Sequence, residues 1–466
     1  MTLPEATPRP RSSRPRSGDP FAYARACLDR IARRPGHAVI TLPAPCADPV
    51  ALLAHRTEPS VAWEPPNGDR IVGWGVAAQI EASGSERFSS IRDQATRILS
   101  RAEVFHHRDA PDVVPRFFGG FAFSAGSAKA GPWASFGDAT FVLPRWTYGR
   151  RGSTAWLSLA IDGDGALSEG TRLLGELDEL LASMRTRGSL PAEAPDAGAQ
   201  AVEHLSRDDW QTRVQAATAA ISEGDLRKVV VARCSFVQAK AALDPESLLT
   251  RLRRSYPECF SFSMRFRDTA FLGAAPERLV QRSGNHVVTE ALAGSIDVRE
   301  EFASERLRES AKDRAEQRFV VQHVLDRLGP YCAQLSHPSE PGVRVLPNLV
   351  HLCTPIHGTL SSPVHILDLV ALLHPTPAVG GVPTERALPW IAANEPSPRG
   401  WYAGPVGWFD REGDGEFAVA LRSGLVRGRE AWIYAGAGIV EGSDPDAEYQ
   451  ETALKLRAVL GALGIE

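Results

Sequence analysis

Apolar residues recur at two different periods along the 466-residue chain, and these periods predict both helices and strands. Leucines three and four residues apart predict a helix over residues 173–184. Similar spacing predicts a helix that starts after Ser206, whose hydroxyl is expected to cap it, and long helices over about 303–328 and 445–463.

Continuous apolar runs predict strands, several of them buried. Lys228 opens the clearest run, which continues through three valines to Arg233. Further strand-like runs lie at 37–42, 117–123, 155–161, 270–274, 286–289, 417–421 and 431–435. Strands that cluster together with helices between them favour a large α+β fold.

Two stretches lack this periodicity and divide the chain. Residues 1–19 are rich in Arg and Pro and predict a disordered tail, and the Pro/Ala/Gly-rich residues 187–203 predict an exposed linker. We therefore distinguish an N-terminal portion, 20–190, from a portion with sharper motifs, 200–463.

Charge and cysteine content narrow the class of protein. The net charge of −4 does not favour binding to nucleic acid or to an anionic membrane surface. The six cysteines include no CxxC spacing, which favours reduced thiols in a cytoplasmic protein over a redox or metal motif. No apolar run approaches the roughly 20 residues that span a bilayer, and the first residues lack the apolar segment of a secretory signal.

Two acidic pairs share the spacing that places carboxylates on one helical face: Asp313 with Glu316, and Glu448 with Glu451. Lys455 lies one turn beyond Glu451. Such pairs are often solvated surface groups. Alternatively, two facing helices supply a magnesium site, because Mg²⁺ takes one or two carboxylates and fills its other positions with water or substrate oxygens.

Lys228 and Glu277 are candidates for proton transfer. Lys228 precedes an apolar strand, and burial lowers the pKa of an unpaired lysine toward the range of a general base. Glu277 follows a strand and Pro276, where partial burial would keep its carboxyl protonated as a general acid. An exposed strand edge for Lys228 and a solvated turn for Glu277 are the alternatives.

Arg422 ends another apolar run, so its guanidinium is expected to hold a carboxylate, either of the protein or of a substrate. Small-residue segments at Gly294, Gly380 and Gly436 allow backbone N–H groups to approach an anion, although ordinary turns share this composition. The sequence contains no P-loop, no HExxH and no context typical of a Ser-His-Asp triad.

Taken together and in order, these segments resemble the chorismate-utilising enzymes. The resemblance is strong over about 200–460 and weaker over 20–185. The segments that carry it are KVVVAR, GAAPERLV, TEALAGS, KDRAE, HLCTPIHG, LHPTPAVGG, GWYAGPVG, VALRSG and AGAGIVEGSDPDAEYQET. It implies one integrated α+β domain, a two-layered sandwich of large antiparallel sheets with helices packed outside.

The same resemblance implies roles for individual residues. Lys228 would activate water for attack at ring C2 of chorismate, and Glu277 would protonate the departing C4 hydroxyl. Glu316 and Glu451 would bind Mg²⁺, with Asp313 and Glu448 nearby. The remaining substrate-binding residues would be Gly294, Ser295, His351, Ala378, Tyr402, Arg422, Gly436 and Lys455. Gln317 follows Glu316 where the family often has histidine, and it is expected to lie outside the ligand set.

Within the family, members that add water resemble this chain in having lysine at the position of Lys228. Members that add ammonia typically carry glutamine at that position and use an amidotransferase subunit. Ala293 occupies the position of a nucleophilic lysine in another branch. Ala378 resembles the isochorismate synthase branch, since salicylate synthases tend to have threonine. We therefore expect a cytoplasmic isomerase that serves menaquinone or siderophore/salicylate synthesis, acting as a monomer or homodimer without an amidotransferase. A salicylate synthase and a catalytically silent chorismate-binding subunit are the alternatives.

Overall fold

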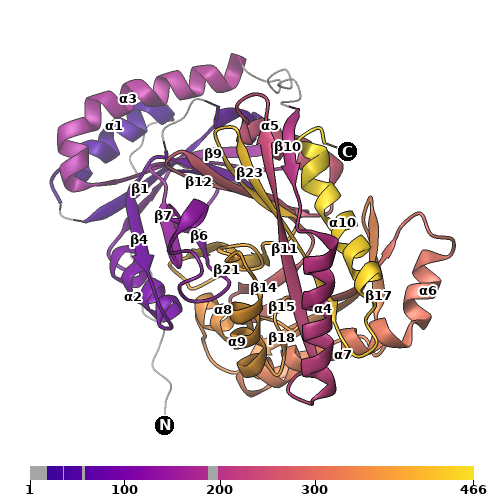
Figure 1. Ribbon diagram of the computed structural model, residues 1–466. Helices are drawn as coiled ribbons and strands as arrows, with labels where there is room; N and C mark the ends of the chain where they lie inside the picture. The colour runs from indigo at the N-terminus through magenta and orange to yellow at the C-terminus, as the bar shows by residue number, and fades with distance from the viewer. Residues whose placement is uncertain (1–17, 35, 55–57, 187–197, 466) are drawn as a thin grey trace, which may run out of the picture.

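Two large β-sheets form the centre of the computed structural model, which describes residues 18–34, 36–54, 58–186 and 198–465 (Figure 1). The expected tail therefore lies almost entirely outside the described residues, as do residues 187–197 of the expected linker. Neighbouring strands are antiparallel except β1 and β5, which run parallel.

In the described residues the first sheet has thirteen strands, and β19 pairs with β11 beside the main path. Their order is β10 (Ala199–Glu203), β11 (Lys228–Ala239), β23 (Glu430–Ile439), β22 (Ser423–Arg427), β13 (Thr269–Ala275), β12 (Phe260–Phe266), β2 (Ser60–Glu64), β3 (Arg70–Trp74), β8 (Trp146–Arg151), β9 (Thr154–Asp162), β1 (His37–Pro43) and β5 (Glu103–His106), with β19 at Gly381–Val382.

The second sheet has ten strands in the same part of the chain, and β17 pairs with β18 beside the main path. Their order is β16 (Cys332–Ser336), β18 (Leu349–Leu360), β15 (His286–Asp297), β14 (Arg278–Ser283), β21 (Gly415–Val419), β20 (Pro405–Asp410), β6 (Arg116–Phe121), β7 (Ala139–Leu143) and β4 (Ala78–Ala82), with β17 at Gly342–Val345.

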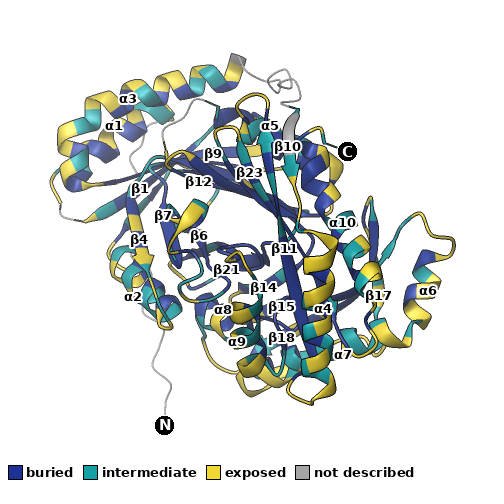
Figure 2. Cartoon of the chain, viewed as in Figure 1, coloured by how far each residue is buried: buried dark blue, intermediate teal, exposed yellow. Residues whose placement is uncertain are grey.

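Helices cover the outer faces of both sheets and expose their polar sides to solvent (Figure 2). The first sheet carries α1 (Pro20–Ile31), α3 (Gly163–Thr186), α4 (Arg207–Ser222), α5 (Pro245–Ser255), α9 (Thr384–Asn394) and α10 (Pro445–Ala462). The second carries α2 (Arg87–Leu99), α6 (Ala303–Glu309), α7 (Ala311–Leu328) and α8 (Ile366–Leu373). No helix in the described part of the chain is long and apolar enough to cross a membrane.

The main apolar core combines side chains of both sheets. Phe262 and Phe271 of the first sheet belong to the same buried cluster as Phe121 and Phe417 of the second. Both sheets also contain strands from before and after residue 190. The α+β class, with antiparallel sheets as layers and helices outside, is confirmed.

Two expectations about the elements are wrong. The helix expected over 303–328 is two helices, because Ser310 has an extended ψ of 114° and its hydroxyl caps α7 at the N–H of Asp313. The end of the expected linker is the strand β10, which pairs with β11 through main-chain hydrogen bonds that polar and small residues also form. The helix that follows Ser206 is confirmed, and the Ser206 hydroxyl accepts from the N–H of Asp209 at 3.1 Å.

Removing the hydroxyl of Ser206 should destabilise the protein through α4. Ser206→Ala is expected to lower the free energy of unfolding by about 1 kcal/mol, the usual cost of losing an N-cap. Chemical denaturation measures the change. Thr212→Ala, on an exposed position of the same helix, is the control, because its hydroxyl bonds only the carbonyl of Asp208 one turn back. An equal loss in both variants would contradict the capping role.

Candidate active site

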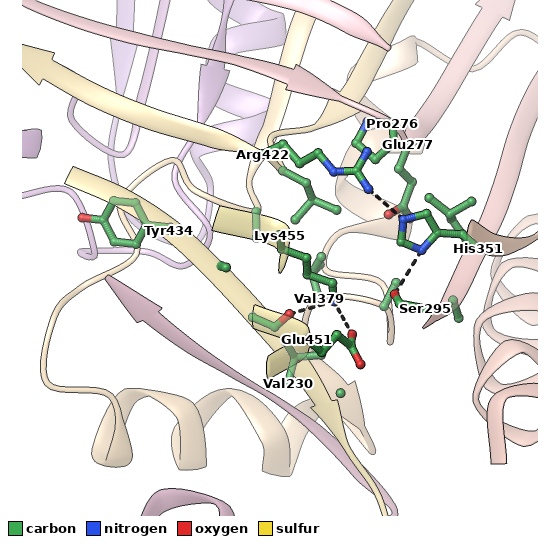
Figure 3. A pocket seen from close by; sticks show the side chains of 18 of the residues that line it. Val230, Pro276, Glu277, Ser295, His351, Val379, Arg422, Tyr434, Glu451 and Lys455 are labelled. Atoms are coloured by element: carbon green, nitrogen blue, oxygen red, sulfur yellow. Dashed lines mark hydrogen bonds and ion pairs between the residues drawn. The ribbon is translucent and has the colours of Figure 1, made fainter. Parts of the chain in front are cut away.

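A pocket of about 730 Å³, partly open to solvent, lies where β11 and β23 of the first sheet face β15 and β18 of the second. Helices α7 and α10 and the loops around residues 277, 378, 402 and 422 complete its wall. Figure 3 shows polar side chains entering it from several sides. Eleven of the predicted site residues line it: Glu277, Gly294, Ser295, Glu316, His351, Ala378, Tyr402, Arg422, Gly436, Glu451 and Lys455.

Lys228 is fully buried at the start of β11, so the alternative of an exposed strand edge is wrong. Its Nζ lies 2.7 Å from Oε1 of Glu316 on α7. Burial alone would raise the pKa of Glu316, but the charge and hydrogen bond of Lys228 hold it below its usual value. The pair joins a strand of the first sheet to a helix that covers the second.

Glu277 is also buried, with 1% of its surface exposed, so a solvated turn is excluded. Burial raises the pKa of Glu277 to about 8, and the negative charge of Glu290 is the next cause. Its Oε1 has no hydrogen-bond partner among the residues that the structure describes. At neutral pH the pocket therefore contains a protonated carboxyl that is available to donate to a ligand.

The four predicted metal carboxylates fall into two groups. Glu316 and Glu451 line the pocket. Glu448 is buried outside the lining and pairs with Lys312 at 2.7 Å, while the carboxylate of Asp313 accepts one hydrogen bond from the hydroxyl of Ser310. Burial raises the pKa of both Glu448 and Asp313, and carboxylate neighbours add to this effect. Neither pair is a solvated surface face.

Two carboxylates on one pocket match the preference of Mg²⁺ for one or two protein carboxylates. Within the described residues, no three His, Cys, Asp or Glu side chains form a group that could hold a metal ion by themselves. Gly438 leaves space beside Glu316, since a Cβ at this position would lie 2.7 Å from Oε1 of Glu316. The donor set thus fits a magnesium ion that draws its other ligands from water and substrate, and its presence stays a prediction.

Arg422 is 5% exposed and has a positive φ of 48°, a conformation that costs a non-glycine residue about 1–3 kcal/mol. Its Nη2 donates to Nε2 of His351 at 2.7 Å, so the ring proton of His351 is on Nδ1, which donates to the carbonyl of Gly294 at 2.9 Å. Burial, together with the charge of Arg422, lowers the pKa of His351 well below its usual value. His351 is therefore a neutral acceptor that orients Arg422.

The cations of the pocket differ in their partners. Lys455 pairs with Glu451 at 2.6 Å, and Arg399 pairs with Glu395. Among the lining residues that the structure describes, Arg422 has no carboxylate partner, and its buried Nε has no acceptor. A buried guanidinium in this state favours an anionic ligand.

The other predicted residues shape the wall. Gly294 has a φ of +69°, and a Cβ there would lie 2.8 Å from Oδ1 of Asp313. The ring of Tyr402 stacks on Tyr434 with centroids 5.2 Å apart, and the carbonyl of Gly436 accepts from Lys455 at 2.9 Å. Gln317 lies outside the pocket lining, as expected, and donates to the carbonyl of Ala291 and to Thr354.

Several residues of the pocket wall were not predicted from the sequence. Arg399 is 3% exposed and donates to the carbonyls of Val379 and Val230, which fixes two pocket segments. Tyr434 and Gly438 lie on β23 next to the predicted Gly436. The period-two pattern of β23 places Tyr434, Gly436 and Gly438 on one face, a signal that was present in the sequence.

Comparison with known proteins agrees with this geometry. The sequence profile of the family described as chorismate binding enzyme matches residues 24–464. The chain belongs to the chorismate binding enzyme family. All the lining residues of the pocket lie within the matched part of the chain.

Individual relatives cover most of this chorismate binding enzyme. The salicylate biosynthesis isochorismate synthase of Pseudomonas aeruginosa is 36% identical over 88% of this chain and 85% of its own length. The isochorismate synthase MenF of Bacillus subtilis is 34% identical over 87% and 88%. The solved structure of MenF, the menaquinone-specific isochorismate synthase from Escherichia coli, has a TM-score of 0.78 at 29% identity and covers 96% of this chain and 100% of that chain.

The protonated state of Glu277 can be measured directly. Infrared difference spectra of Glu277→Gln against the unmodified protein should show a protonated-carboxyl band at pH 6 that disappears as pH rises through about 8. Because the folded pKa lies above the unfolded value, ionisation at high pH costs stability. The melting temperature of Glu277→Gln minus that of the unmodified protein should therefore be more positive at pH 9 than at pH 6. A carboxyl ionised at pH 6 would contradict the assignment.

Proposed function

We propose that the protein is an isochorismate synthase, which interconverts chorismate and isochorismate reversibly and depends on Mg²⁺. The observation that carries the proposal is the buried, protonated Glu277 in the same pocket as the ammonium group of Lys455 and the guanidinium of Arg422, which has no carboxylate partner among the described lining residues. The family match and the two isochorismate synthase relatives support it.

The proposed reaction needs an acid because hydroxide is a poor leaving group. Water oxygen bonds to ring C2, both ring double bonds shift by one position, the C4–O bond breaks, and the leaving oxygen takes a proton. Glu277 supplies this proton from its unpartnered carboxyl. A charged carboxylate here would instead repel the substrate's own carboxylates.

Lys228 is the proposed base that takes the proton of the attacking water. Its Nζ donates to Oε1 of Glu316, so the side chain that holds Lys228 in place is also a proposed metal ligand. Gly438 leaves the space beside both groups, since a Cβ there would lie 3.1 Å from Cε of Lys228. The base is on β11 of the first sheet, and the acid is in the turn that joins β13 of the first sheet to β14 of the second.

Chorismate carries two carboxylates, and the pocket offers separate cationic positions for them. Arg422, oriented by His351, is proposed to bind one carboxylate through paired hydrogen bonds. Lys455 is proposed to hold the other carboxylate together with Mg²⁺ on Glu316 and Glu451. The metal, when bound, supplies charge neutralisation at that carboxylate.

Product analysis tests the proposal. Purified protein incubated with chorismate and Mg²⁺ should yield isochorismate, and isochorismate should return to chorismate, while a chelator abolishes both conversions. Chromatography of the mixture separates the outcomes. Salicylate plus pyruvate would identify a salicylate synthase and show that Ala378 does not discriminate the branches. Turnover only with ammonia, or binding without turnover, would overturn the proposal.

Substitution of the acid or the base should reduce turnover far more than binding. Lys228→Ala and Glu277→Gln are each expected to lower kcat by about 10²- to 10⁴-fold, the usual contribution of one proton-transfer group. Steady-state kinetics and circular dichroism measure rate and fold together. Gln317→Asn, which alters a buried polar residue outside the lining, is the matched control. A near-normal rate in either variant would remove that residue from its role.

The wider setting is also proposed. We infer a cytoplasmic enzyme without an amidotransferase subunit, because the base position holds lysine. The relatives named for salicylate biosynthesis and for menaquinone favour these two uses of the product equally.

A further inference from the structure

The turn that carries Glu277 is held by an ion pair between a buried glutamate and a partly exposed arginine, neither of which lines the pocket. Glu290 on β15 is 7% exposed and accepts from both terminal nitrogens of Arg344, each at 2.7 Å. Arg344 comes from β17, where it lies opposite His351 in the ladder with β18. The pair is bidentate, the geometry in which an arginine and a carboxylate fix each other most firmly.

Both partners also bind the main chain of the turn. Arg344 donates to the carbonyl of Pro276, and Oε1 of Glu290 accepts from the N–H of Arg278 at 2.7 Å. The carbonyl of Glu277 itself accepts from Val419 at 3.1 Å. The residues on either side of Glu277 are therefore clamped by one ion pair, while the carboxyl of Glu277 makes no hydrogen bond through Oε1.

We propose that Glu290 and Arg344 form a positioning pair that fixes the Pro276–Arg278 turn so that the Glu277 carboxyl faces the reacting oxygen of the substrate. This inference rests on the proposed function, because it assigns the pair to the acid of that reaction. Neither side chain lines the pocket, and each holds the main chain of the turn next to Glu277, so both are positioning residues.

The two charges act on Glu277 in opposite directions. The carboxylate of Glu290 favours the protonated acid, and the guanidinium of Arg344 favours the ionised form. The other groups that face Glu277 are Lys228 and Lys455, which favour ionisation, and the thiol of Cys353. Removal of one member of the pair should shift the titration of Glu277 with a sign set by the charge removed.

The test compares Glu290→Gln and Arg344→Gln in the full-length protein. Both variants should lower kcat by about tenfold or more, while KM for chorismate changes by less than about twofold. The reason is that a misplaced acid slows the chemical step but does not alter the groups that bind the substrate. Glu290→Gln removes a negative charge and should move the basic limb of the kcat profile down by about one pH unit. Arg344→Gln removes a positive charge and should move that limb up.

Glu64→Gln is the matched control. Glu64 is buried on β2 in an ion pair with Arg253 at 3.1 Å and does not line the pocket. The Glu64→Gln variant should have a lower melting temperature, but the basic limb of its pH profile of kcat should not shift. Limbs that stay unchanged, or move in the same direction in both variants, would overturn the proposal and leave the pair a structural one.

Infrared titration of Glu277 in the same proteins makes the test independent of the reaction. Opposite shifts of the protonated-carboxyl band would support the pair even if chorismate gave a different product. Absence of isochorismate from the unmodified protein would instead reject the proposed function. If Glu290→Gln does not fold, the upward shift of the Glu277 titration in Arg344→Gln is the remaining test. Arg344 is partly exposed, so its substitution disturbs folding less.

Discussion

The buried ion pair of Lys228 and Glu316 is the constraint on which the pocket depends. A lysine with no exposed surface requires a carboxylate, and that carboxylate comes from α7, which covers the other sheet. Breaking such a pair by removing one partner usually costs about 3–5 kcal/mol, because the remaining charge stays buried. The pair therefore fixes the distance between β11 and α7, and with it the depth of the pocket.

The same rule explains the electrostatics of the site. Other charges around the pocket occur as neutral pairs, the buried Arg399 with Glu395 and the partly exposed Lys455 with Glu451. In contrast, the protonated carboxyl of Glu277 and the guanidinium of Arg422, which has no carboxylate partner in the described lining, are available to bind a ligand. The wall is thus prearranged for an anion that also needs a proton, and little reorganisation is required when the ligand binds.

The sequence predicted most of the site because its residues lie next to strong local patterns. Lys228 begins an apolar run and Glu277 follows a strand and a proline, which made both candidates, while the resemblance of the motifs to chorismate-utilising enzymes favoured the buried positions over the exposed ones. Glu290 and Arg344 were not found, because a valine-rich strand and a short edge strand 54 residues apart gave no local sign that they pair. The break at Ser310 was missed for a related reason, since helical apolar spacing continues on both sides of it.

The alternation of β11 has a consequence for how this family can vary. Val230 lines the pocket and Lys228 bonds to Glu316 in the pocket wall, while Val229 and Val231 are fully buried in the apolar core. Loss or gain of a single residue near the start of this strand would exchange the two faces and turn the lysine into the core. Length changes in the gene should therefore be tolerated in the surface loops but eliminated here, so that natural divergence at this strand proceeds by substitution alone.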